Sequence, residues 1–266
     1  MKTSVPITVA VSLLFVTTGH AQLLISEYLA NPSGTDSPFE FVELIAAEDI
    51  DFSITPYSVV FSDNGTANAS GWIAGGALTY GFSITAGFVT RGDVVYVGGS
   101  SMAPTGTKLR TIDTLTVPGD RFGDPRSGVL GNGGNNADGI AVFNVGIDSL
   151  TPATVPIDTI VFGTAAGNAV VSGGAEGYQL AVNDHYAGGK LQSDSFLAPD
   201  PPGGEFTVLS GIYDYSSGSW LDPRSFTLTP TLSDGVSGIV LVPEPGTWAL
   251  MGLGVIGLLW RCRRKA

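Results

Sequence analysis

Residue types that carry out catalysis are sparse in this 266-residue chain, and histidine shows this most clearly. The sequence has two histidines, and His20 precedes the cleavage point that we expect after Ala21, which leaves His185. A Ser–His–Asp triad would depend on that one residue, and no Gly-x-Ser-x-Gly nucleophile elbow accompanies it. Zinc sites need three or four ligands, and one histidine is too few for the common motifs. We therefore predict no catalytic residue, no metal site and no enzymatic activity.

The 24 acidic residues keep two alternatives open. A glycoside hydrolase needs two carboxyl groups flanking the scissile bond, and spacing along the chain does not identify such a pair. Calcium binds six to eight oxygens, but the sequence lacks the spacing of known calcium loops. We expect no cofactor, with calcium as the alternative. Four carboxylates lie near the start of the body: Glu27, Asp36, Glu40 and Glu43. Each could face solvent, cap backbone amides or share a cation with the others.

Aromatic residues offer another kind of binding site. The stretch GIYDYSSGSW, Gly211–Trp220, places Tyr213, Tyr215 and Trp220 beside Asp214. Aromatic rings on a β-rich surface stack on sugar rings in carbohydrate-binding modules. The same rings also suit ordinary core and loop packing, which we favour. Carbohydrate binding is therefore the alternative function.

The charge of the chain is unevenly distributed. The chain contains 12 Lys and Arg residues and 24 Asp and Glu residues, which gives a net charge of −12. Lys2 and four cations in the last six residues leave seven for the body, against all 24 acids, so the body carries −17. Such a surface argues against nucleic-acid binding, which needs basic patches. The only cysteine, Cys262, lies near the C-terminus, so the body contains no disulfide.

Short β-rich runs bounded by Gly, Pro, Asn and Asp dominate the body, and helical periodicity is nearly absent. This pattern predicts an all-β protein with the architecture of a β-sandwich. Two stretches, Gly119–Gly139 and Leu197–Glu205, are predicted loops, and Asp234–Val242 is a spacer or the last strand. The predicted strands are Leu23–Leu29, Glu40–Ile45, Tyr57–Ser62, Leu78–Ile84, Asp93–Gly98, Lys108–Ile112, Gly139–Val145, Pro156–Phe162, Gly177–Val182, Glu205–Leu209 and Arg224–Thr229.

The N-terminus has the features of a secretory signal peptide. Lys2 precedes an apolar stretch, Ile7–Val16, and small residues follow at Gly19 and Ala21. We predict cleavage after Ala21, so that Gln22 becomes the first residue of the exported protein.

The C-terminal segment has the features of a membrane-inserted helix. Gly246–Trp260 is uncharged, and as a helix it would be about 22 Å long, which is short for a bilayer core of about 30 Å. Trp248 and Trp260 suit the two interfaces. A basic cluster that we expect to remain cytoplasmic completes the tail: Arg261, Arg263, Arg264 and Lys265.

Three features occur in order at this end: Val242-Pro243-Glu244-Pro245, the apolar run and the basic cluster. Together they resemble the PEP-CTERM sorting signal of Gram-negative bacteria. The resemblance implies an exosortase-type processing enzyme as partner, transient anchoring in the inner membrane and cleavage near Pro-Glu-Pro. It also implies delivery to the envelope or extracellular polymer.

The start of the body resembles the opening of a lamin-tail-like domain, an immunoglobulin-type sandwich. The stretch ISEYLANPSGTDSPFEFVEL follows that family's pattern, and FSITPYSVVF replaces its usual Leu-x-Gly-Trp element. Asp138–Asn144 and Pro156–Gly163 fit the closing hairpin. The resemblance implies a binding or structural module without catalytic residues. The matching positions are Ile25, Glu27, Asn31, Pro32, Asp36 and Glu40–Leu44.

These observations predict an exported, non-enzymatic structural or adhesive protein. The alternatives are a carbohydrate-binding module that binds extracellular polysaccharide and, third, a carboxylate-dependent glycoside hydrolase. The predicted organisation begins with a signal peptide at 1–21 and a lamin-tail-like, immunoglobulin-like sandwich at 22–163. A further β-rich region at 164–235 is predicted to pack on the same sandwich. The sorting signal with its transmembrane helix occupies 236–266.

Overall fold

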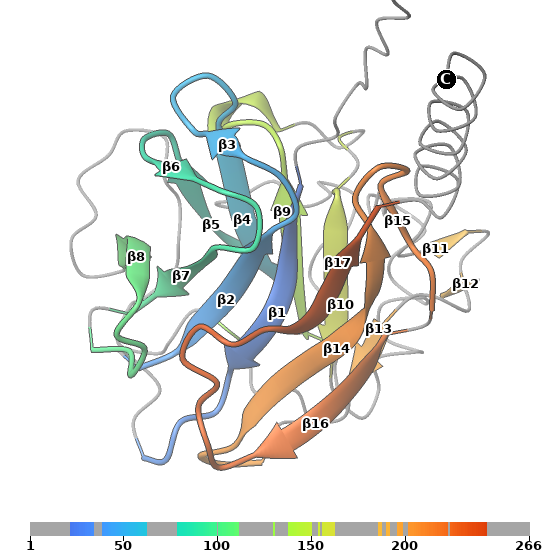
Figure 1. The fold of residues 1–266 in the computed structure, drawn as a ribbon. Helices are drawn as coiled ribbons and strands as arrows, with labels where there is room; N and C mark the ends of the chain where they lie inside the picture. Colours follow the sequence, from blue (N-terminus) through green and yellow to red (C-terminus); the bar gives the residue numbers. More distant parts are fainter. Residues whose placement is uncertain are drawn as a thin grey trace, which may run out of the picture.

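The computed structural model describes residues 22–34, 39–62, 79–99, 101–111, 130, 138–150, 154, 156–162, 186–187, 190–191, 196–198, 202–222 and 224–243 (Figure 1). The predicted signal peptide at 1–21, the predicted strand Gly177–Val182, His185 and the tail from Glu244 onward lie outside these residues. Within the described part, no helix has the length and hydropathy needed to cross a bilayer.

The larger sheet joins strands from both ends of the chain. Its order is β15-β14-β1-β2-β7-β8, and β16 and β17 also pair with β14. The long strand β14 has β1 and β17 along one edge and β16 and β15 along the other. The strands are β1 (Leu23–Leu29), β2 (Phe41–Ala46), β7 (Val94–Gly98), β8 (Thr107–Thr111), β14 (Phe206–Asp214), β15 (Ser219–Trp220), β16 (Ser225–Thr229) and β17 (Gly238–Val242).

The smaller sheet has the order β13-β10-β9-β4-β5, and two short ladders complete the fold, β3 with β6 and β11 with β12. The one helical turn of the described residues is η1, a 3-10 turn at Ile147–Ser149. The all-β prediction is therefore confirmed for the described residues. The strands are β13 (Phe196–Ala198), β10 (Asp158–Phe162), β9 (Asp138–Phe143), β4 (Tyr57–Ser62), β5 (Thr79–Ile84), β3 (Ile50–Asp51), β6 (Phe88–Val89), β11 (Tyr186–Ala187) and β12 (Lys190–Leu191).

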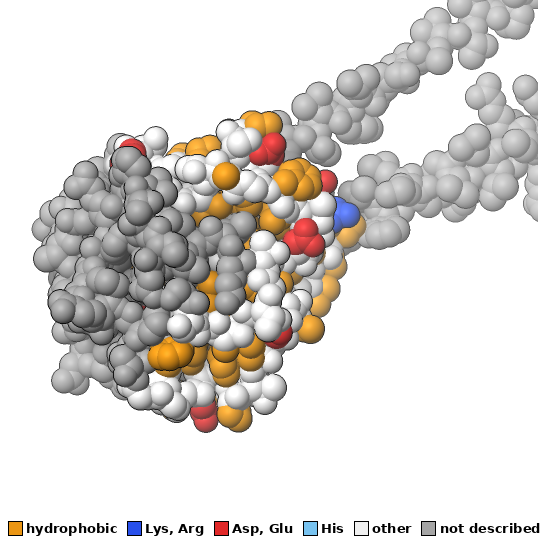
Figure 2. All heavy atoms as spheres, turned by 90° about the vertical axis from the view of Figure 1, so that its left-hand side faces the viewer, with side chains coloured by type: hydrophobic (Ala, Val, Ile, Leu, Met, Phe, Trp, Pro, Cys, Tyr) orange, Lys and Arg blue, Asp and Glu red, His pale blue; other side chains and the backbone are white. Residues whose placement is uncertain are grey.

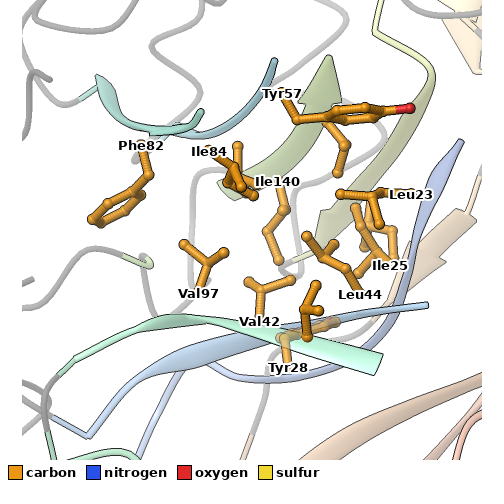
Figure 3. Packing of buried hydrophobic residues seen from close by; sticks show 14 of the residues in the cluster. Leu23, Ile25, Tyr28, Val42, Leu44, Tyr57, Phe82, Ile84, Val97 and Ile140 are labelled. Atoms are coloured by element: carbon orange, nitrogen blue, oxygen red, sulfur yellow. The ribbon is translucent and has the colours of Figure 1, made fainter. Parts of the chain in front are cut away.

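The core lies between the two sheets (Figure 3). Alternate residues of β2, Val42 and Leu44, enter it and meet side chains of the smaller sheet such as Ile140. Each fully buried aliphatic side chain of this kind contributes about 1.5–3 kcal/mol. The immunoglobulin-like topology stays a prediction.

The opposite face of the larger sheet is also covered. Leu24 and Ile45 pack there against Ile239 of β17, while Phe41 and Tyr96 form a further cluster with Met102. All residues of β1 and β2 are consequently buried. The outer face of β2 carries Glu43 between Phe41 and Ile45, and all three side chains are closed to solvent.

A buried ion pair ties the late strands to the smaller sheet. The Asp158 carboxylate of β10 lies 2.8 Å from a guanidinium nitrogen of Arg224 and accepts the Ile25 N–H at 2.7 Å, where β1 has an irregular register. Arg224 also donates to the carbonyl of Thr159 at 3.1 Å. Burial raises the pKa of Asp158, and the attraction of Arg224 works against that rise.

Candidate functional site

Strand β17 is the last described strand and leads directly into the sorting motif. It pairs in parallel with residues 210–214 of β14 along its whole length. Ile239 is buried against Leu24 and Ile45, and the Val242 carbonyl accepts the Tyr215 N–H at 3.1 Å. Val242 and Pro243 therefore lie at a fixed exit point, whereas the motif residues Glu244 and Pro245 lie outside the described residues.

Two buried carboxyl groups hold the loop that precedes β17. Glu27 of β1 and Glu43 of β2 are directly opposed in the antiparallel register, and neither is exposed. The Ser233 hydroxyl donates to Glu27 Oε2, and the Ser233 N–H reaches Glu27 Oε1 at 3.4 Å. The Gly235 N–H reaches Glu43 Oε2, also at 3.4 Å. Capping of backbone amides, one of the three roles open to these acids, is therefore observed at Ser233 and Gly235.

Further hydrogen bonds fix both the acids and the loop. Glu43 accepts from the Ser26 hydroxyl at 2.6 Å and from the Tyr96 hydroxyl at 2.7 Å. Asp234 has a φ of 43°, and its carboxylate accepts the Thr105 N–H at 2.9 Å and the Thr105 hydroxyl at 2.8 Å. The loop is thus attached to β1, β2 and the segment before β8, and these contacts position β17.

Burial raises the pKa of Glu27 to about 7. The hydrogen bond from the Ser233 side chain opposes this rise, and the negative charge of Glu43 adds to it. A carboxyl group that is buried beside another carboxyl group holds its proton to a higher pH. Glu27 therefore loses its proton at a higher pH than an ordinary glutamate does.

The same three roles were open to two further acids, Glu40 and Asp36. Glu40 accepts the Leu130 N–H at 3.3 Å, and Asp36 lies outside the described residues. Within the described part of the chain, no three His, Cys, Asp or Glu side chains are grouped as metal ligands would be.

The three aromatic rings that offered the alternative of a sugar-binding platform are packed against protein groups. Tyr213 is fully buried, and its ring centroid lies 5.1 Å from that of Trp220. The Arg224 guanidinium lies 4.6 Å from the Trp220 ring, and the Arg91 guanidinium lies 4.4 Å from the Tyr215 ring. This arrangement matches the core and loop packing that we favoured from the sequence.

Asp214 shapes the turn beside these rings. Burial acts to raise its pKa, but hydrogen bonds from Ser216 and Ser217 together outweigh burial and lower it. The neighbouring Tyr213 contacts the start of the described chain, because its hydroxyl donates to Gln22 Oε1. Gln22, the predicted first residue of the exported protein, is therefore attached close to β17, because Tyr213 is also the register partner of Leu241.

The exit point of β17 coincides with the start of a known sorting signal. Residues 241–265 match the PEP-CTERM protein-sorting motif. The PEP-CTERM motif directs export and sorting to the envelope through a membrane-anchored C-terminal tail, and it is a substrate signal for exosortase-type processing. It includes every predicted sorting and tail residue: Val242, Pro243, Glu244, Pro245, Trp248, Trp260, Arg261, Arg263, Arg264 and Lys265.

The comparisons with curated proteins and with solved structures gave no match. The lamin-tail-like resemblance of the body, its division into domains and the cleavage between Ala21 and Gln22 stay predictions.

The sequence did not reveal the contacts of the Ser233–Gly235 loop. Its Ser-Asp-Gly composition is a turn signal, so the loop itself was accessible to prediction. Its partners were not, because Glu27 lies 206 positions earlier in the chain.

Proposed function

We propose that this chain is an exported, non-enzymatic structural or adhesive protein of the envelope or extracellular polymer. The PEP-CTERM motif supports the route. The acidic body supports the role, because a net charge of −17 favours solubility and the binding of cationic groups.

One observation carries the proposal: the matched sorting motif, residues 241–265, begins within the last two residues of β17, the last strand of the described residues. Val242 is the final residue of β17 and is hydrogen-bonded to the body, while Pro243 follows it without a strand partner in the described residues. Cleavage after Val242 therefore removes no strand and no core side chain of the part of the chain that the structure describes. The cargo retains its fold when the tail is lost.

The test is the intact mass of the protein from the producing organism, with inner membrane, envelope and medium separated. We expect a species that lacks residues 1–21 and the residues after about 245, found outside the inner membrane. A full-length C-terminus that remains in the inner membrane would remove the extracellular role.

The adhesive role is tested by cosedimentation of the purified body with the organism's own exopolysaccharide. Binding that persists in Trp220→Ala but weakens at high salt supports an acidic-surface contact. Binding that Trp220→Ala abolishes would instead identify a carbohydrate-binding module.

A further inference from the structure

We propose that the end of the sandwich from which β17 exits, bearing Ile54 and Phe88, rests on the bilayer that holds the C-terminal tail. This inference rests on the proposed function, because it requires the tail to be in a membrane. It adds which surface of the body faces the lipid before processing.

The length of chain after β17 gives the first argument. Trp248, which suits the interface, lies six residues beyond Val242. Six residues span at most about 20 Å when fully extended. Two of the three residues before the apolar run are prolines, and proline restricts the directions in which the chain can leave. The exit end of the body therefore cannot lie far from the lipid headgroups.

A series of contacts places the β3–β6 ladder at this same end. The Val242 carbonyl accepts from Tyr215, and Arg91 covers the Tyr215 ring. The Arg91 N–H donates to Asp49 at 2.9 Å, immediately before β3. Figure 1 shows β3, β6 and the arrowhead of β17 in the upper part of the molecule. The ladder and the exit are thus neighbours.

This ladder exposes two large hydrophobic side chains. Ile54, in the turn after β3, is 79% exposed, and Phe88 of β6 is 62% exposed. Phe88 is the register partner of Asp51, and the Phe52 N–H donates to the Gly87 carbonyl, so both side chains belong to one small unit. Exposed apolar groups next to a membrane tether suit the headgroup boundary.

Charge indicates how this contact is made. Asp49, Asp51 and Asp93 share this end with Arg91, and Figure 2 shows acidic side chains beside hydrophobic ones on the upper part of the described surface. Anionic lipids repel such a surface, so the body stays at the bilayer because the tail tethers it there and not because the body itself binds lipid. Release of the tail therefore also releases this surface from the lipid.

The experiment uses the full-length chain in nanodiscs of phosphatidylethanolamine and phosphatidylglycerol that contain nitroxide-labelled lipid. In a Cys262→Ser background, a fluorophore is attached at Ala86→Cys, beside the ladder, or at Ser33→Cys. Ser33 is the matched control: it is exposed and follows the end of β1, which runs opposite to β17. We expect quenching at position 86 to exceed that at position 33 several-fold, and Ile54→Ser/Phe88→Ser to reduce the quenching at 86.

The outcomes separate the two proposals. A chain that enters the bilayer but is quenched equally at positions 86 and 33 overturns this surface alone, and points to a different partner such as the processing enzyme. A chain that does not enter the bilayer overturns the sorting role as well.

Discussion

The Ser233 hydroxyl lies between the carboxyl groups of Glu27 and Glu43: it donates to Glu27 Oε2, and its oxygen lies 3.4 Å from Glu43 Oε2. Both side chains are fully buried on adjacent strands. Glu27 is therefore a buried acid beside a second carboxyl group, and it holds its proton up to about pH 7.

Glu27→Gln tests this relationship through the pH dependence of stability. The pKa of Glu27 is about 7 in the folded chain and 4.5 as its ordinary value, so the folded state binds the extra proton between these two pH values. Stability from this group is present below pH 4.5 and is lost as the pH rises to about 7. We expect Glu27→Gln to be more stable than wild type by roughly 1–2 kcal/mol at pH 8 and to differ little at pH 4.5.

Chemical denaturation at several pH values measures this difference. The control is Asp222→Asn, which removes an exposed acid and should leave the pH dependence of wild type unchanged. A Glu27→Gln variant that is less stable than wild type at pH 8 would contradict the pairing.

The buried Asp158–Arg224 pair predicts a strong asymmetry between single and double variants. Arg224→Met leaves a buried carboxylate without its cation and should cost about 3–5 kcal/mol. Asp158→Asn/Arg224→Met removes both charges and retains an acceptor for the Ile25 N–H, so it should recover part of that loss. Urea midpoints check this, and a double variant as unstable as the sum of the single changes would argue against coupling.

Gly238→Ala tests whether β17 needs its close approach to β14. An added Cβ would collide with the Leu209 carbonyl oxygen, so β17 should shift at a cost of about 1–3 kcal/mol. The matched control is Gly203→Ala, whose Cβ would lie 3.9 Å from Asn31 in ordinary contact. Limited proteolysis should cut the β17 region faster in Gly238→Ala only, and equal rates in both variants would mean that β17 is not held by this contact.

Calcium should leave the stability unchanged. Glu27 and Glu43 already accept hydrogen bonds from Ser233, Ser26 and Tyr96, so a cation would have to displace these donors. We expect the same Tm in millimolar calcium and in chelator. A rise in Tm of several degrees with calcium, and not with magnesium, would revive the cation-bridging alternative.

Local pattern was sufficient to predict much of the strand content. The predicted strands Leu23–Leu29 and Tyr57–Ser62 coincide with β1 and β4, and most others agree within two residues at either end. These runs are bounded by turn residues, which act locally. The final stretch, predicted as a spacer or last strand, contains β17.

Features that depend on distant partners were beyond the sequence. Strand β14 continues to Asp214 although the predicted strand ended at Leu209, because β15 and β17 supply partners for its second half. The predicted loop Leu197–Glu205 begins inside β13 for the same reason, since parallel pairing with β10 makes a strand of Phe196–Ala198. The burial of Glu27 likewise depends on Ser233, far along the chain.

The pairing of β1 with β14 constrains the order in which the strands of this body can pair during folding. Tyr28 of β1 pairs with Thr207 of β14, and Gln22 accepts a hydrogen bond from Tyr213, which lies 191 positions later in the chain. Contacts of such long sequence separation form slowly, and until they form, the edge of β1 is open to other strands. A chain that emerges from a translocation channel therefore reaches its final fold only when its last strands have emerged, and its first strand needs protection until then.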